Sequence, residues 1–162
     1  MVPVSGFFDI RDDSAFFAVV SNALNSFLST KTKKPEDLLL LILGLAHLRE
    51  WIAPKYERGA APRNSAERFA AILYENPNYQ TVLLLANHAK HQRRGALPET
   101  QSMTFVDTID ERDIPIDSWP DFDQGPASSY LYGQRNLEDL FKEVALLYRE
   151  QWFSLPIDQR LA

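Results

Sequence analysis

The chain lacks cysteine altogether, and this absence removes several kinds of site at once. It excludes disulfide bonds, catalytic thiolates and zinc sites with cysteine ligands. Glycine is scarce as well, with six residues scattered over 162 positions. The sequence therefore contains no glycine-rich loop of the kind that holds phosphate groups in nucleotide-binding proteins.

Positive charge is also in deficit, since 17 Lys and Arg residues stand against 22 Asp and Glu residues and give a formal net charge of −5. A protein that wraps nucleic acid needs many cations, so only a local basic patch remains open. The longest apolar run, residues 38–46, is far shorter than the roughly 20 residues that span a bilayer. Residues 1–10 lack the pattern of a signal peptide. We therefore expect a soluble, cytoplasmic protein without a membrane partner.

Five stretches have the apolar spacing of helices, and most begin with a residue that favours a helix start. Residues 38–45, in the second stretch, are apolar on every side, which indicates a helix surrounded by others. No alternation of strands and helices is present to build a parallel sheet. The sequence predicts a single-domain, all-α helical bundle over residues 1–162. The expected helices cover residues 12–28, 35–51, 64–73, 79–92 and 136–152.

An irregular insertion is expected over about residues 96–133, before the last helix. Seven acidic residues between positions 107 and 123 stand against a single arginine. Clustered carboxylates and prolines oppose both helix formation and burial, so we expect a solvated and mobile segment that offers a contact surface to a protein partner. Within it, residues 103–110 and 114–116 have the composition of a small hairpin.

The fourth expected helix changes from apolar to polar near its end. Residues 83–86 are apolar, and Asn87, Lys90 and His91 follow them. At 100° per residue, Asn87 and His91 share one helix face and Lys90 lies just beside it. This row continues a row of leucines, so we expect it to point toward the core.

His47 has a comparable place in the second helix, where it shares a face with Leu43, Glu50 and Trp51. Polar groups carried inward by apolar helices require a partner, a charge or a metal. We therefore predict that His47 and His91 approach each other in a groove between the second and fourth helices, with Trp51 in its wall.

Two structural explanations of these residues stay open. Cations near a helix C-terminus interact favourably with the helix dipole, so Lys90, Arg93 and Arg94 could simply form a solvated helix end. His47 and Asn87 could instead form a hydrogen-bonded pair in the core.

Three functional interpretations compete with them. His88 and His91 could share a metal ion with His47 and Glu50, but the third and fourth ligands are poorly specified and we expect no metal. A histidine near its neutral-pH midpoint could perform acid–base chemistry. Alternatively, Lys90 together with Arg93 and Arg94 could bind phosphate groups or RNA without catalysis.

The segment His47-Leu48-x-x-Trp51 and the later segment Asn87-x-x-Lys90-His91 resemble motifs of the HEPN-like superfamily, specifically small prokaryotic and phage-associated members. The resemblance covers the second to fourth helices and implies an all-α fold. Many such proteins are metal-independent ribonucleases in toxin–antitoxin and phage-defence systems, and others are non-catalytic. The chain departs from the catalytic pattern, because no arginine precedes a histidine at the usual spacing.

The preferred hypothesis is accordingly a HEPN-like protein that binds or cleaves RNA without a cofactor. His91 would act as general base on a ribose 2′-OH, with His47 as acid and Lys90 stabilising the phosphorane, while Asn87 completes the catalytic set. Trp51, Arg93 and Arg94 would contact the substrate, and a homodimer is compatible with this role. The opposing hypothesis is a non-enzymatic protein-interaction module, a phage or defence accessory factor in which the polar cluster is structural.

Overall fold

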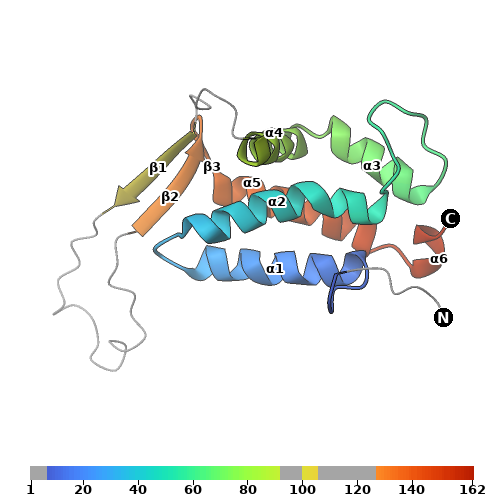
Figure 1. The fold of residues 1–162 in the computed structure, drawn as a ribbon, viewed down its shortest axis with the longest axis horizontal. Helices are drawn as coiled ribbons and strands as arrows, with labels where there is room; N and C mark the ends of the chain where they lie inside the picture. The colour runs from blue at the N-terminus through green and yellow to red at the C-terminus, as the bar shows by residue number, and fades with distance from the viewer. Residues whose placement is uncertain (1–6, 92–99, 106–126) are drawn as a thin grey trace.

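Three long helices pack side by side in the computed structural model, which describes residues 7–91, 100–105 and 127–162 (Figure 1). They are α1 Asp13–Ser29, α2 Pro35–Ile52 and α5 Leu137–Tyr148. Helices α3 Ser65–Glu75 and α4 Pro77–His91 also contact α2, and α4 contacts α5 as well. This arrangement confirms the predicted all-α bundle. Within the described residues, no helix is both long and apolar enough to cross a membrane.

Most helices begin where the local sequence predicts, because short polar side chains accept hydrogen bonds from the free N–H groups of the first turn. The exception is α4, which begins at Pro77 and not at the expected Tyr79. Asp12 accepts from the amide of Ala15 at 2.7 Å and caps α1. Asn64 accepts from the amide of Glu67 at 2.8 Å and caps α3. The second helix starts with Pro35, whose missing N–H costs nothing at that position.

The expectation that other helices surround α2 is wrong for one face. Leu41, Leu45 and Leu48 are fully buried, but Leu39 and Leu40 are each 47% exposed. The neighbouring helices cover only part of the circumference of α2. A sequence that is apolar on every side cannot show which side is left uncovered.

A small antiparallel sheet of order β1-β2-β3 lies at one end of the bundle (Figure 1). Its strands are β1 Thr100–Phe105, β2 Ala127–Tyr132 and β3 Arg135–Asn136, and Met103 pairs with Ser129. Residues 100–105 overlap the first half of the expected hairpin, but their partner is β2 and not residues 114–116. The expected partner and the acidic segment 107–123 lie outside the described residues, so the mobility of that segment stays a prediction.

The C-terminal region differs from the expected single helix. Asn136 caps α5 by accepting from the amide of Glu138 at 2.9 Å, as predicted. The helix then widens into a π-helical turn, Arg149–Phe153, and a short helix α6 follows at Ile157–Arg160. The apolar stripe through residues 137–152 shows no glycine or proline that would reveal this change of geometry.

Candidate functional site

His47 lies on the uncovered face of α2, where its side chain is 30% exposed. Its Nδ1 atom lies 3.5 Å from Oε2 of Glu50, which follows one turn later. A carboxylate beside Nδ1 favours the tautomer with the proton on that nitrogen, which leaves Nε2 available to accept a proton. The pair therefore has the composition of an acid–base group, at a position that solvent reaches.

Trp51 lies on the α1 side of the same face. Its ring centroid is 5.1 Å from that of Phe16 in α1, and the side chain is half-buried. Together with Glu50 it also lines a broad pocket at one end of the bundle. Trp51 was predicted to lie in the wall of a groove between the second and fourth helices. It does line a pocket, but that pocket is lined also by residues near both ends of the chain and not by α4.

The polar end of α4 points into solvent. Asn87 and Lys90 are exposed, and their side chains form no hydrogen bond or ion pair with another residue in the described part of the chain; His88 is half-buried. The expectation that Asn87 continues a core-facing row is therefore wrong. Periodicity correctly aligns it with the preceding leucines, but of these Leu84 is itself exposed.

One hydrogen bond between α2 and α4 is made near the start of α4. The Tyr79 hydroxyl donates to the carbonyl of Ala46 at 2.7 Å. At about 1.5 Å per residue, Asn87 and Lys90 lie roughly 12 and 16 Å further along the axis of α4. The side chain of His91 and all of Arg93 and Arg94 lie outside the described residues. The predicted approach of His91 to His47 thus stays a prediction.

A buried polar network that the sequence did not reveal lies directly behind His47. Arg49 is buried, and its Nε donates to the Tyr79 hydroxyl at 3.2 Å. Its guanidinium lies 4.7 Å from the ring centroid of Tyr74, and Nη2 is 3.5 Å from Oε1 of Glu50. Glu50 therefore lies between the buried arginine and the half-exposed His47. The available signal was the helical spacing of Arg49, which follows Leu45 by four residues and precedes Ile52 by three, and both of these are buried.

Burial raises the pKa of the two tyrosines whose hydroxyls donate to the backbone of α2. Desolvation raises the pKa of Tyr79 to about 12, although the neighbouring Arg49 opposes the shift. Desolvation also raises the pKa of Tyr148 well above its ordinary value, and this hydroxyl donates to the carbonyl of Leu45 at 2.7 Å. Both phenols are therefore neutral hydrogen-bond donors at neutral pH and hold the backbone of α2 in place.

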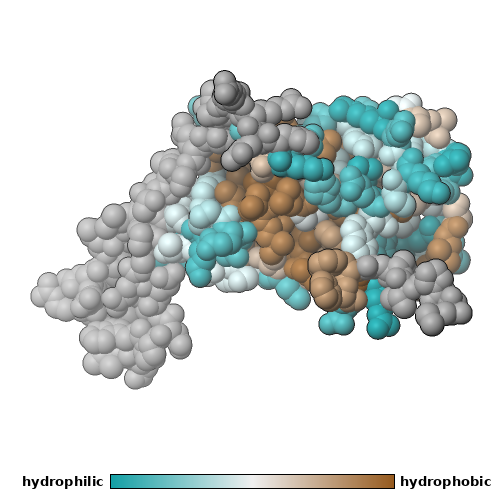
Figure 2. Space-filling view, in the orientation of Figure 1, coloured by the Kyte–Doolittle hydropathy of each residue, from teal (hydrophilic) through white to brown (hydrophobic). Residues whose placement is uncertain are grey.

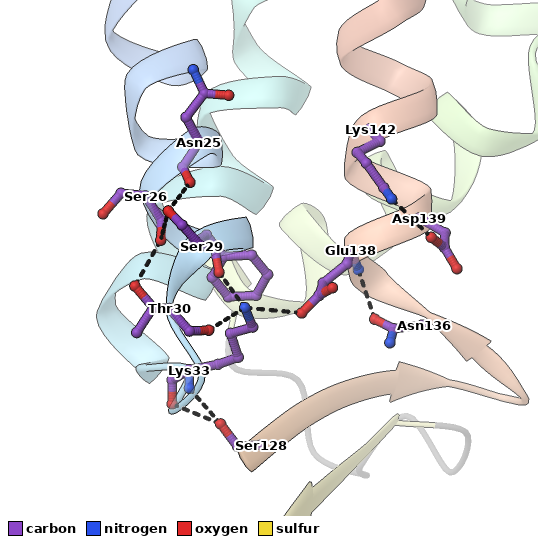
Figure 3. A network of polar contacts seen from close by, with 11 residues as sticks. Asn25, Ser26, Ser29, Thr30, Lys33, Ser128, Asn136, Glu138, Asp139 and Lys142 are labelled. Carbon is purple, nitrogen blue, oxygen red and sulfur yellow. Dashed lines mark hydrogen bonds and ion pairs between the residues drawn. The ribbon is translucent and has the colours of Figure 1, made fainter. Parts of the chain in front are cut away.

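A second buried cation, Lys33, joins three parts of the fold (Figure 3). Its ammonium donates to the carbonyls of Phe27 and Thr30 at the end of α1 and lies 3.0 Å from Oε1 of Glu138 in α5. Its amide donates to the hydroxyl of Ser128 in β2. Every proton donor on this ammonium is occupied, so Lys33 is a structural residue and not a binding site.

An exposed apolar surface runs across α2. We call it the apolar face, and its described members are Val19, Leu39, Leu40, Leu43 and Leu83. Figure 2 shows it as a hydrophobic area over α2 and the adjoining parts of α1 and α4. His47 lies one helical turn beyond Leu43, so the polar cluster of α2 borders this surface.

No group of three metal-ligating side chains occurs among the residues that the structure describes. Comparison with known proteins adds no assignment, because no protein family, curated protein or solved structure matches the chain.

Proposed function

We propose that the chain is a helical protein-interaction module and that the apolar face is its contact surface. The observation that carries this proposal is the exposure of large apolar side chains on adjacent helices, 47% for Leu39 and Leu40 and 42% for Val19. Contiguous exposed apolar area on a soluble protein often marks an interaction site. The net charge of −5 favours a protein partner over nucleic acid.

The exposed residues of α2 have the spacing of a seam that packs against one other helix. Glu36, Leu40, Leu43, His47 and Glu50 follow one another at alternating intervals of four and three residues. This alternation keeps one stripe facing a partner helix over several turns. The seam has an apolar middle and polar ends, which is the usual composition of an interface core and its rim.

The partner that fits this seam is a second copy of the chain, packed antiparallel about a two-fold axis. If Leu40 of one copy lies opposite Leu43 of the other, Glu36 lies opposite His47. This polar pair joins unlike groups, and Glu36 is exposed. A stable interface buries about 800 Å² per partner. In this one the leucines would form the core and the polar ends of the seam would form the rim.

Sedimentation velocity over roughly 1–200 µM protein tests the association. We expect the wild-type chain to dimerise and Leu40→Glu to remain monomeric, because a carboxylate would be buried opposite a leucine. Leu146→Glu is the matched control, since Leu146 is 42% exposed on α5 and lies outside the apolar face. A wild-type monomer over the whole range, or equal effects of the two variants, contradicts the proposal.

The absence of native cysteine allows a direct test of the orientation. A mixture of Leu40→Cys and Leu43→Cys chains should form a disulfide-linked dimer faster than either variant alone. Parallel packing would instead cross-link each variant with itself. A mixture of Leu40→Cys and Leu146→Cys provides the background rate. If association is seen only when a different protein is present, the partner of the apolar face is that protein and not a second copy of the chain.

RNA binding or metal-independent RNA cleavage is a second candidate, supported by the His47–Glu50 pair beside Trp51. Labelled single-stranded and hairpin RNA, incubated with the protein in EDTA, tests it. We expect His47→Ala and His91→Ala to abolish cleavage with little loss of stability, and His88→Ala to retain it. Intact RNA with the wild-type protein, combined with no RNA binding at low salt, excludes this candidate.

A further inference from the structure

His47 lies where two carboxylates meet near the end of the α2 seam. In its own chain, Nδ1 of His47 lies 3.5 Å from Oε2 of Glu50. In the antiparallel dimer proposed above, Glu36 of the second copy lies opposite the same imidazole. The two-fold axis repeats this arrangement, so the dimer contains two histidines that each lie between two carboxylates.

Both carboxylates are in contact with solvent. Glu36 is exposed in the first turn of α2, where the positive end of the helix dipole favours a negative charge. The side chain of Glu50 is 53% exposed. Exposed carboxylates are ionised at neutral pH, so a neutral imidazole leaves two negative charges across the interface without a cation between them. A protonated imidazole donates from both nitrogens and can bond to both carboxylates.

The other charged groups around His47 do not supply a cation between the two copies. Arg49 is buried beside the ring of Tyr74, and its guanidinium lies behind Glu50, 3.5 Å from Oε1. On the helices packed against α2, the relevant titratable groups are engaged elsewhere, neutral or without a contact to His47. They are Asp13 of α1, bonded to Trp152; Glu67 of α3, paired with Arg63; the neutral phenols Tyr79 of α4 and Tyr148 of α5; and His88 and Lys90 of α4, whose side chains form no hydrogen bond or ion pair with a described residue.

We propose that protonation of His47 strengthens the association of two chains through the apolar face. This inference rests on the proposed dimer and adds its regulation by pH. Histidine side chains ordinarily change charge between pH 5 and 8. The dimer favours the charged imidazole more than the monomer does, because only the dimer adds the second carboxylate. By linkage, the state that binds more protons gains stability as the pH falls, so the dimer tightens at lower pH and weakens at higher pH.

Sedimentation velocity at about pH 6 and about pH 8, at constant ionic strength, measures the effect on Kd. We expect the Kd of the wild type to be about five- to tenfold lower at the acidic pH, since a single exposed ion pair stabilises weakly but two form in each dimer. His47→Gln should lose this difference. His47→Lys carries a fixed positive charge and should keep the tighter dimer at both pH values.

The matched control is His88→Gln, which removes a histidine outside the seam and should keep the pH dependence of the wild type. This control also accounts for the net negative charge of the chain, which falls with pH and favours association of any two copies. A wild-type dimer with equal Kd at both pH values overturns the role of His47 and leaves the dimer standing. Equal pH dependence of His47→Gln and His88→Gln overturns it as well. A wild-type chain that is monomeric at both pH values overturns this inference together with the proposed dimer.

Discussion

Replacing Lys33 by methionine should remove a large part of the stability of the fold. Methionine keeps most of the length and apolar stem of lysine but lacks the ammonium. The change leaves the carbonyls of Phe27 and Thr30 without their donor and removes the ion pair at 3.0 Å from Glu138. It also separates the end of α1 from α5, two elements that Lys33 connects (Figure 3).

The size of the loss follows from these contacts. A hydrogen bond to a charged group contributes about 1.5–3 kcal/mol, and Lys33 makes two such bonds to carbonyls. The gain from not burying an ammonium offsets part of this, and Glu138, whose side chain is 26% exposed, can be rehydrated. We expect a net loss of about 3 kcal/mol, or roughly 6–12 °C in Tm.

Urea unfolding of the wild type, Lys33→Met and Lys34→Met measures the effect. Lys34 is the exposed neighbour, so its replacement should change the free energy of unfolding by less than about 0.5 kcal/mol. A double-mutant cycle with Glu138→Gln isolates the ion pair from the carbonyl contacts. A loss below about 1 kcal/mol for Lys33→Met, or equal losses at both lysines, would refute the structural role of the buried ammonium.

Three other predictions concern the core and a helix cap. Gly44→Ala would place a Cβ atom 2.9 Å from Cγ2 of Val20. In urea unfolding it should therefore lower the free energy of unfolding less in a Val20→Ala background than in the wild type, and equal losses would argue against the close contact. The pKa of Tyr79 is about 12 in the fold against about 10 in the unfolded chain, so its contribution to stability is fully present below pH 10 and falls by roughly 3 kcal/mol as pH rises through 12. Tyr79→Phe should flatten this alkaline decline in Tm, and an unchanged profile would contradict the shift. Asn136→Ala should cost about 1 kcal/mol in thermal unfolding and Asn136→Ser much less, whereas equal losses would mean that the cap is not the cause.

Local interactions explain why the helices could be located from the sequence. The oxygens of Asp12, Asn64 and Asn136 bond to amides two or three residues away, so the residues that start a helix lie together in the chain. The same holds for Pro35 at the start of α2. The widening of α5 into a π-helical turn was missed, because nothing within the apolar stripe marks it.

The candidate site was predicted less well, since periodicity compares faces of one helix without showing which face is covered. His47 and Glu50 do share a face and lie 3.5 Å apart, as their spacing suggests. Asn87 and Lys90 were aligned correctly with leucines, but they are exposed. Arg49 was overlooked because its partner Tyr79 lies 30 residues away.

The sequence by itself determined the helical class, most of the helix starts and the exclusion of cysteine and glycine-loop chemistry, because composition and contacts within a few residues suffice for these. Only the tertiary structure decided which side of α2 stays open, which cations are buried and where the chain ends form a pocket. The apolar face around Leu40 and the hydrogen bond from Arg49 to Tyr79 both arise from elements distant in the chain. Their exposure or burial depends on how whole helices pack, and no short stretch of sequence contains that information.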